Sequence, residues 1–202
     1  MLKNIIEDLD IYAYRKGWPK WSVLFIPIFY WTTWPIISYR FSHWVHYRVN
    51  ILFFRQVLKC FSFMSQRFFE TFTSVEISEK AFIGKGIFIA HYGSIVISER
   101  TRIGDYVSLH QGVTLGGAGR GEDYGDPVLG DRVYIGAGAK VVGKVNLGSD
   151  IMIGCNSVVT KNFPDSTTLG GVPAKILNYD GSVGFIHYRN QKNHNLDLCK
   201  IQ

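Results

Sequence analysis

The stretch LGDRVYIGAGAKVVGKVNLGSDIMIGCNSVV, residues 129–159, decides the fold because an aliphatic residue returns at every sixth position. The same period begins at residue 77 and is interrupted only twice. Its thirteen members are Ile77, Ile83, Ile89, Ile97, Ile103, Leu109, Leu115, Leu129, Ile135, Val141, Leu147, Ile153 and Val159. Thirteen aliphatic residues in phase are poorly explained by chance, so the pattern indicates a repeat architecture.

A six-residue period favours a triangular solenoid, in which each hexapeptide forms one short strand and a corner. The aliphatic residue points inward, and three hexapeptides close one coil, which predicts about four coils in all. Glycine follows seven of the thirteen aliphatics, where we expect it to permit a tight turn with unusual backbone angles. A doubly wound α/β sheet is excluded because alternating helical segments are absent. The expected stacks are Ile135 on Ile153, Leu129 on Leu147 and Ile97 on Leu115.

The two interruptions of the period mark loops that leave the stack. Eight residues separate Ile89 from Ile97, and fourteen separate Leu115 from Leu129, so each interval is two residues too long. The first contains AHYGS, residues 90–94, and the second contains GGAGRGEDYGDP, residues 116–127. Because loops on a rigid scaffold often carry function, we expect the catalytic groups there.

The composition divides the chain into unlike parts. Of the 202 residues, 47% are apolar and 19% charged, so a sizeable core is possible and general disorder is excluded. Cys60, Cys155 and Cys199 show no metal-ligand spacing, and three cysteines exclude a disulfide scaffold. Residues 1–74 hold 20 of the 30 aromatics, all five tryptophans and one of the 21 glycines. We predict a helical region over residues 1–74, a catalytic solenoid over residues 75–177 and a tail over residues 178–202.

The positive charge lies mainly in the first part. Residues 1–74 carry nine Lys/Arg against four Asp/Glu, which accounts for +5 of the net charge of +6. A basic face attracts nucleic acid, anionic lipid or an anionic substrate, although an ordinary solvated face is also compatible. No run of Lys/Arg and no nucleic-acid motif appears, so we exclude nucleic acid as a partner.

Residues 21–39, WSVLFIPIFYWTTWPIISY, contain no charged residue and approach the length of a membrane span. Pro27 and Pro35 argue against one uninterrupted helix, and the Trp, Tyr, Ser and Thr content suits an interface better than a hydrocarbon centre. We favour a buried oligomer contact and keep shallow attachment to the inner membrane face and a true span as alternatives. The protein is otherwise expected to be cytoplasmic.

Residues 40–67 follow as a predicted amphipathic helical region that packs against the solenoid. Its apolar positions at helical spacing are Phe41, Trp44, Val45, Val49, Leu52 and Phe53. Basic residues on its other faces are Arg40, Arg48, Arg55 and Lys59.

His91 is the leading candidate for catalysis. It lies at the first interruption, two positions after an inward aliphatic residue, and its neighbours are small enough to leave access. A histidine there can take a proton from a hydroxyl near neutral pH, and the alternative is an ordinary loop histidine. His110 occupies the slot after Leu109 and is expected near the site, whereas His43 and His46 are interpreted as structural. No histidines and carboxylates share a metal-ligand spacing, so we expect no catalytic metal.

Two further motifs are weak when each is considered alone. The glycine-rich GGAGRG, residues 116–121, lacks the Lys-Ser/Thr pair of a phosphate-binding P-loop and has no helix pattern after it. Its plain interpretation is a flexible turn. Lys175, in GGVPAKIL just past the last repeat, could meet a phosphate or be a solvated side chain.

Together these motifs resemble the hexapeptide-repeat acyltransferases with a left-handed parallel β-helix. The segments VSLHQGVTLGGAGRG (residues 107–121), residues 128–159 and GGVPAKIL (residues 170–177) carry the resemblance, and YRFSHW at residues 39–44 is similar to the helix before the β-helix of serine acetyltransferases. The resemblance covers roughly residues 39–177. It implies acetyl-CoA as donor, a trimer with active sites between subunits, and a hexamer through the front helices as an alternative.

The resemblance also implies roles for single residues. His91 matches the family's general base, and Glu76 lies where the family has an aspartate that pairs with this base; a glutamate keeps the charge. Asp10, five residues before Arg15, loosely resembles an acceptor-contacting aspartate, and Tyr92 and His110 are further candidates for acceptor contact. Positions that match contacts to the pantetheine arm or the phosphates of CoA are Gly117, Ala137, Cys155 and Lys175.

Two departures bear on the acceptor. Serine acetyltransferases have aspartate before the catalytic histidine, where this chain has Ala90, and they have Asp-Arg-His-Pro where it has Tyr-Gly-Asp-Pro at residues 124–127. Without those charged groups a zwitterion loses its paired charges. We therefore expect a sugar or surface-polysaccharide hydroxyl as the acceptor, because the aromatic front also resembles acetyltransferases from surface-polysaccharide gene clusters.

Two alternatives remain. Serine O-acetylation for cysteine synthesis is the first, although the ending CKIQ, residues 199–202, lacks the terminal isoleucine that the cysteine-synthase partner binds. A non-catalytic trimeric scaffold is the second.

Overall fold

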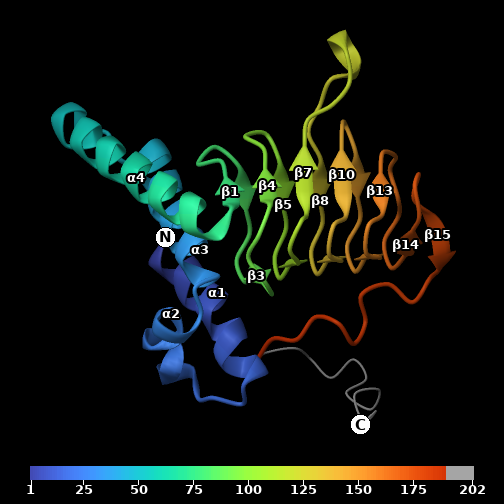
Figure 1. Ribbon diagram of the computed structural model, residues 1–202, viewed down its shortest axis with the longest axis horizontal. Helices are drawn as coiled ribbons and strands as arrows, with labels where there is room; N and C mark the ends of the chain where they lie inside the picture. The colour runs from blue at the N-terminus through green and yellow to red at the C-terminus, as the bar shows by residue number, and fades with distance from the viewer. Residues whose placement is uncertain (190–202) are drawn as a thin grey trace.

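The computed structural model describes residues 1–189 and joins a bundle of helices to a parallel β-solenoid (Figure 1). The helices are α1 Leu2–Arg15, the 3₁₀ helix η1 Lys20–Leu24, α2 Ile26–Phe29, α3 Thr33–Arg48 and α4 Leu52–Thr73. The first nine strands are β1 Val75–Ile77, β2 Phe82–Ile83, β3 Phe88–Ile89, β4 Ile95–Ile97, β5 Arg102–Ile103, β6 Ser108–Leu109, β7 Thr114–Gly116, β8 Val128–Leu129 and β9 Tyr134–Ile135. The rest are β10 Lys140–Val142, β11 Asn146–Leu147, β12 Met152–Ile153, β13 Val158–Val159, β14 Thr168–Gly170 and β15 Lys175–Asn178.

The strands form three sheets, which are the faces of a triangular prism. Face A has the order β1-β4-β7-β10-β13, face B has β11-β8-β5-β2, and face C has β15-β14-β12-β9-β6-β3. The register confirms the predicted stacks, with Ile153 beside Ile135, Leu147 beside Leu129 and Ile97 beside Leu115. The inward aliphatic residues are buried in one continuous core, which accounts for the two- and three-residue strands. The solenoid fold is confirmed.

The solenoid is longer than the expected four coils, because face A has five parallel strands. On face C, Ile153 pairs with Leu169, which is sixteen residues later, whereas Ile135 and Ile153 are eighteen apart. The last coil is therefore two residues shorter than the regular one. A search at a fixed six-residue period loses its phase there and misses that coil.

The glycines after the inward aliphatics follow from close packing and not from unusual backbone angles, which corrects the sequence prediction. Gly84, Gly104, Gly130 and Gly148 stack at the corner between faces B and C, and none of them has a positive φ. A Cβ on Gly84 would lie 2.6 Å from the carbonyl carbon of Gly104. Positive φ occurs two positions later along the chain, at Gly86, Tyr106, Arg132, Asp150 and Ser166.

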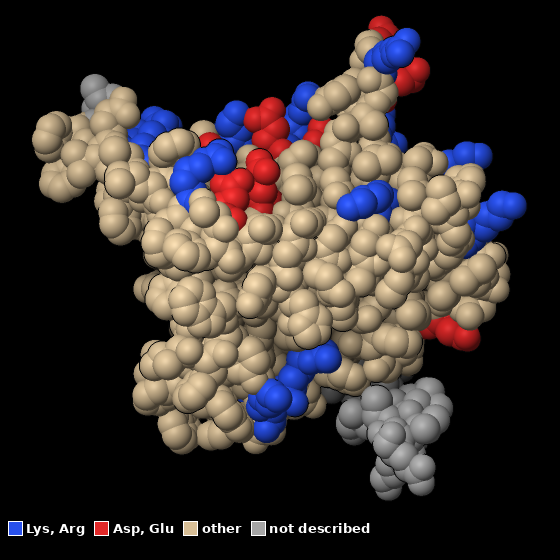
Figure 2. Space-filling view, in the orientation of Figure 1, with Lys and Arg blue, Asp and Glu red and all other residues tan. Residues whose placement is uncertain are grey.

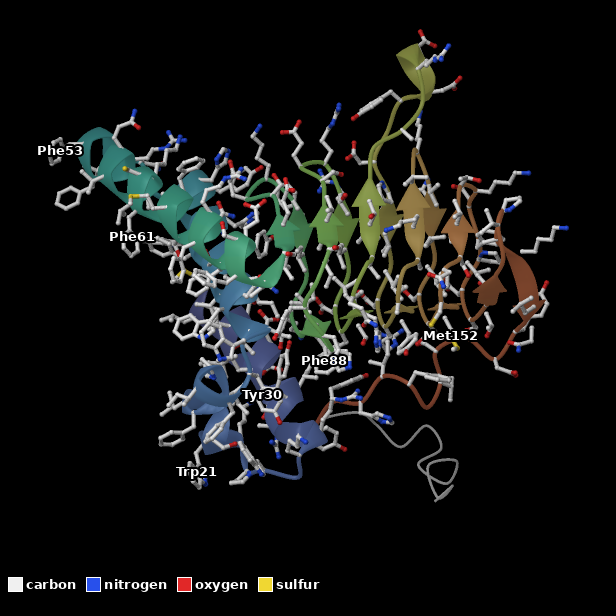
Figure 3. All side chains as sticks on the ribbon, viewed as in Figure 1. Trp21, Tyr30, Phe53, Phe61, Phe88 and Met152 are labelled. Carbon is white, nitrogen blue, oxygen red and sulfur yellow. The ribbon has the colours of Figure 1, made fainter. Side chains whose placement is uncertain are left out.

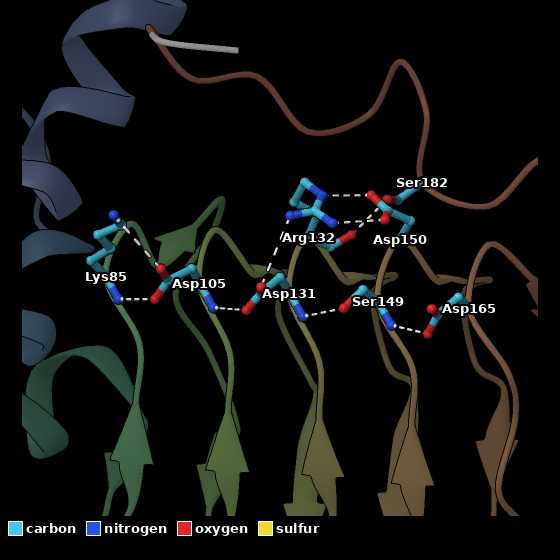
Figure 4. Close-up of polar contacts among 8 residues, drawn as sticks. All are labelled: Lys85, Asp105, Asp131, Arg132, Ser149, Asp150, Asp165 and Ser182. Atoms are coloured by element: carbon cyan, nitrogen blue, oxygen red, sulfur yellow. Dashed lines mark hydrogen bonds and ion pairs between the residues drawn. The ribbon is translucent and has the colours of Figure 1, made fainter. Parts of the chain in front are cut away.

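The same corner carries a ladder of side chains that bind backbone N–H groups (Figure 4). The amide of Lys85 donates to Asp105 at 2.9 Å, and the amide of Asp105 donates to Asp131 at 2.7 Å. The ladder continues through Ser149 to Asp165. Each coil thereby provides a hydrogen-bond acceptor for a corner amide of its neighbour. Without that acceptor the backbone N–H group would lack a partner, which costs free energy.

Residues 40–67 form two helices and not one amphipathic region, since α3 ends at Arg48 and α4 begins at Leu52. Two predicted orientations are wrong. Arg40 is 5% exposed because it pairs with Asp8, whereas the predicted core residue Phe53 is 76% exposed. Helical spacing alone does not distinguish a core-facing stripe from an exposed one.

The helical bundle attaches to the first coil through polar contacts inside one shared core. Arg40 donates to both oxygens of Asp8 and to the carbonyl of Ile83, while Asp8 accepts from the amide of Gly86 at 2.7 Å. The hydroxyl of Tyr39 donates to the carbonyl of Ala81. The hydrophobic core runs without interruption from α1 and α3 into the solenoid. The helices are therefore fixed to one end of the prism.

After β15 the chain returns along face C to α1 (Figure 1). Ser182 donates to the carbonyl of Arg132, Tyr188 stacks on Tyr106 at 4.0 Å, and Arg189 pairs with Asp10. Residues 179–189, called the strap below, thus cover part of face C. The remaining tail, residues 190–202, lies outside the described residues. The prediction drawn from the ending CKIQ, residues 199–202, therefore falls outside them too.

None of the helices within residues 1–189 combines the length and the hydropathy that crossing a bilayer needs. The uncharged stretch at residues 21–39 is instead divided among η1, α2 and the first turns of α3.

Candidate active site

His91 lies at the corner between faces C and A, directly after β3, and its side chain is exposed. Ala90 donates its amide to Leu109, and Gly93 accepts from the amide of Gly112, so the backbone on both sides of the histidine is fixed by the next coil. The backbone that carries the imidazole is therefore fixed, while the side chain is exposed to solvent. That is the arrangement a general base needs.

The coil register places other predicted residues in line with His91. Because Ile89, Leu109, Ile135 and Ile153 are in register, His91 is followed by Gln111, Ala137 and Cys155 in successive coils. In the last coil Gly170 follows the inward Leu169, and the strand partner of Gly170 is Lys175, which is exposed. With strands about 4.8 Å apart, the five steps from β3 to β15 separate the histidine from Lys175 by about 24 Å. We call this row the corner column.

His110 stands beside the catalytic candidate in the second coil. The two imidazole centroids are 6.5 Å apart, and the His110 ring lies 4.9 Å from that of Tyr134. Burial lowers the pKa of His110 from its ordinary value of 6.5, and the neighbouring His91 and Arg15 lower it further. His110 is thus neutral at neutral pH and can donate or accept one hydrogen bond.

Glu76 is exposed. It lies on β1 of face A, beside a cavity of about 290 Å³ that α3, α4 and β1 enclose together with Glu70 and Glu79. Burial raises the pKa of Glu70, and the nearby Glu76 raises it further. Within residues 1–189 no hydrogen bond joins Glu76 to His91, so their predicted pairing stays a prediction.

The predicted acceptor-contacting residues have different surroundings. Asp10 is nearly buried, and both its oxygens accept from Arg189 of the strap, so its charge is already paired. Tyr92 follows His91 on the same corner and is exposed. His43, interpreted as structural, donates from Nδ1 to the carbonyl of Glu79 over 2.8 Å.

The second interruption forms an arm that leaves the prism between faces A and B (Figure 1). Ala118 and Gly125 bridge the two halves of the arm, and Arg100 lies over the ring of Tyr124 at 4.8 Å. Asp126 accepts from Ser98 and pairs with Arg100 at 3.4 Å. The arm and Gly117 at its base therefore belong to a different corner from His91.

Three residues around Phe88 and His110 were not predicted as site residues, namely Arg15, Tyr134 and His187. The guanidinium of Arg15 lies 4.5 Å from the ring centroid of Phe88, three residues before His91, and no carboxylate within the described chain pairs with it. The pKa of His187 is lowered mainly by burial and further by the charge of Arg15. The sequence offered only the position of Arg15 at the end of a helix, which does not reveal what the helix faces.

Among residues 1–189, no group of three or more His, Cys, Asp or Glu side chains is arranged to hold a metal ion.

The chain is similar in sequence to known enzymes, although no family model matches it. It is 38% identical to the serine acetyltransferase of Helicobacter pylori strain J99 over 161 residues, which are 80% of this chain and 88% of that protein. It is 46% identical to the serine acetyltransferase of Staphylococcus aureus strain Mu50 over 110 residues, 54% of this chain and 52% of that one.

Solved structures agree with the sequence relatives. Serine acetyltransferase from Brucella abortus strain S19 superposes with a TM-score of 0.70 at 32% identity, over 88% of this chain and 69% of that one. Serine acetyltransferase from Neisseria gonorrhoeae in complex with serine gives a TM-score of 0.71 at 30% identity, over 87% and 68%. The solenoid is thus a β-helix of the left-handed acetyltransferase type. The chain belongs to the serine acetyltransferase family of hexapeptide-repeat proteins and is an acyltransferase that uses acetyl-CoA.

Proposed function

We propose that this chain transfers the acetyl group of acetyl-CoA to the hydroxyl of L-serine, with His91 as general base. The observation that carries the proposal is the exposed imidazole at a rigid corner, in a chain whose relatives are serine acetyltransferases. The relatives favour serine over the saccharide acceptor that the sequence departures suggested.

The mechanism we propose needs no acyl-enzyme. His91 removes the proton of the acceptor hydroxyl while the oxygen attacks the thioester carbonyl. The carbon–sulfur bond then breaks, and the imidazolium returns the proton to the leaving thiolate. Backbone N–H groups near the arm are our candidates for stabilising the tetrahedral oxyanion.

The corner column fits an extended donor. Gly136, Ala137, Gly138 and Gly154 bring only small side chains to it, so the corner leaves room beside the backbone. We propose that the pantetheine arm follows Ala137 and Cys155 and that Lys175 meets the phosphates. The distance of about 24 Å from His91 to the far end suits a donor that lies along several coils.

Arg15 supports a carboxylate-bearing acceptor. The family motif that would clamp the serine carboxylate is missing from the arm, but Arg15 brings a guanidinium to the neighbourhood of His110 without a carboxylate partner of its own. A guanidinium can bind a carboxylate through two parallel hydrogen bonds. We therefore assign the serine carboxylate to Arg15.

A sugar hydroxyl is the second candidate acceptor. Ala90 brings no charge next to His91, and Asp126 of the arm is held by Ser98 and Arg100. An uncharged acceptor would leave fewer unpaired charges in such a site. The acetyl transfer and the role of His91 are the same in both proposals.

The separation of the two loops within one chain supports an assembly of several chains. His91 lies at the corner between faces C and A, whereas the arm and Gly117 lie between faces A and B. One chain therefore does not bring them together, which supports a trimer in which the arm of one subunit approaches His91 of the next.

The decisive experiment is the release of CoA thiol from acetyl-CoA in the presence of L-serine, monosaccharides or bacterial oligosaccharides. Serine-dependent release supports the first proposal, and release with a saccharide alone supports the second. For the carboxylate assignment, Arg15→Ala should raise KM for serine far more than KM for acetyl-CoA. The adjacent and equally exposed Lys16→Ala is the matched control and should change neither.

A further inference from the structure

The helical end of the molecule presents many apolar side chains to solvent. Figure 3 places Phe53, Phe61 and Trp21 along the end of the molecule opposite β15, and Figure 2 shows uncharged surface over α2. Two groups contribute. The η1–α2 corner exposes Trp21, Leu24, Phe25, Ile28, Phe29 and Trp31, and one face of α4 exposes Phe53, Val57, Phe61, Met64, Phe68 and Phe72.

Both groups leave large apolar side chains in contact with water, although burial of such side chains is favourable. Leu24 is 79% exposed and Ile28 is 68% exposed in a 3₁₀ helix and an α-helix of five and four residues. Large contiguous apolar patches on a protein surface mark a site of contact with a protein or a membrane. The charges of the same surface distinguish between these two partners, a protein and a membrane.

The charge is one-sided over the whole region. Residues 11–69 contain eight Lys/Arg and no Asp or Glu at all. Arg40 is neutralised by the buried Asp8, and Lys20 and Arg67 reach Glu7 and Glu70, which lie outside this segment. The other cations have no ion-pair partner among the described residues; they are Arg15, Lys16, Arg48, Arg55 and Lys59.

This charge pattern argues against a second copy as the occupant. A two-fold contact through the η1–α2 corner would bring Lys16 and Lys20 of one copy toward the same cations of the other, and Glu7 is already paired with Lys20. An anionic lipid surface instead supplies the missing negative charge. Segments that lie in the headgroup region of a bilayer typically have tryptophan at the ends of an apolar patch and cations around it.

We propose that the helical end binds the surface of an anionic lipid bilayer, with the η1–α2 corner inserted and Lys16 and Lys20 at the headgroups. The proposal concerns attachment and not crossing, since none of the helices within residues 1–189 is suited to a span. It is independent of the acceptor, because the corner column lies outside the patch.

The test is flotation of the full chain with vesicles of phosphatidylcholine alone and of equal parts phosphatidylcholine and phosphatidylglycerol. We expect binding to the anionic vesicles that falls with added salt. The double variant Leu24→Ser/Ile28→Ser should bind at least about tenfold more weakly. Lys16→Gln and Lys20→Gln should each weaken binding by about fivefold.

The matched control removes two equally exposed apolar residues at the opposite end, Leu177→Ser/Tyr179→Ser, and should bind like the wild type. Unchanged CoA-thiol release with a soluble acceptor shows that each variant is folded. The proposal is overturned if anionic vesicles do not bind the folded chain, or if Leu24→Ser/Ile28→Ser binds them normally. It is also overturned if that variant instead dissociates an oligomer while vesicle binding is absent.

Discussion

Replacing Asp8 by asparagine should destabilise the junction between the helices and the solenoid. Asp8 is 1% exposed, and its two oxygens accept from Arg40 at 2.9 and 3.1 Å and from the amides of Gly86 and Ile87 at 2.7 and 3.0 Å. Asparagine keeps one carbonyl oxygen for the amides but turns an NH₂ donor toward the guanidinium. Arg40 then stays buried without its counter-charge.

Removing one partner of a buried ion pair costs about 3–5 kcal/mol, because an uncompensated charge remains inside. The chain contains a matched control in Arg132 and Asp150, a bidentate pair with side chains 35% and 32% exposed. Water replaces the lost partner there, so Asp150→Asn should cost about 1 kcal/mol or less. The two variants make the same chemical change at different depths.

The assay is urea unfolding followed by tryptophan fluorescence and by far-UV circular dichroism. All five tryptophans lie in the helical region, so their fluorescence reports its detachment directly. We also expect Asp8→Leu/Arg40→Met to recover most of the loss, because apolar residues leave no buried charge. If Asp8→Asn costs no more than Asp150→Asn, the buried pair does not hold the junction and the reasoning is wrong.

Three further results are expected. His91→Ala should lower turnover by about 10²–10⁴-fold with an unchanged circular dichroism spectrum, whereas a much smaller loss would remove His91 from the role of base. Gly104→Ala should cost about 1–3 kcal/mol in urea unfolding because the new Cβ would lie 2.5 Å from the carbonyl oxygen of Gly130, while Gly116→Ala, with 3.6 Å of room, should be close to neutral. Burial lowers the pKa of His43 and His110, so the unfolded chain takes up protons first and stability should fall as pH drops below 6.5; pH-dependent unfolding of His43→Asn/His110→Asn should show a flatter fall.

The solenoid could be predicted from the sequence because its determinant is local and periodic. Each inward aliphatic residue contacts the residue one coil away, so a fixed period carries both the strand and its neighbour. The prediction failed where that regularity ends. The last coil is shortened between Ile153 and Leu169, and the fixed period carries no information about it.

The helical region was less predictable because its packing is decided by tertiary contacts. Arg40 is read as a surface cation until Asp8, thirty-two residues away, is placed beside it. Phe53 is read as core until α4 is seen to begin after a break at residues 49–51. Helical spacing gives the faces of a helix but not which face meets the protein.

At the candidate site the sequence identified single residues but not their grouping. His91, Ala137 and Cys155 share one corner because the coil register brings them together, and the resemblance had named each of them separately. Glu76 and Asp10 were carried over by position, and their roles stay predictions; Glu76 lies near Glu70, and Asp10 is bound to Arg189. Arg15 was missed because only the folded strap and α1 show what it faces.

The arrangement of the corner column also decides how attachment to a surface and catalysis can coexist. His91 belongs to the coil next to the helices, whereas Lys175 lies at the other end, about 24 Å away along the coils. A bilayer at the helical end would therefore lie nearest the acceptor hydroxyl and farthest from the CoA phosphates. Anionic headgroups would not compete with the donor at Lys175. The donor-side KM should accordingly be the same with and without anionic vesicles, and a vesicle-dependent rise in KM for acetyl-CoA would contradict this orientation.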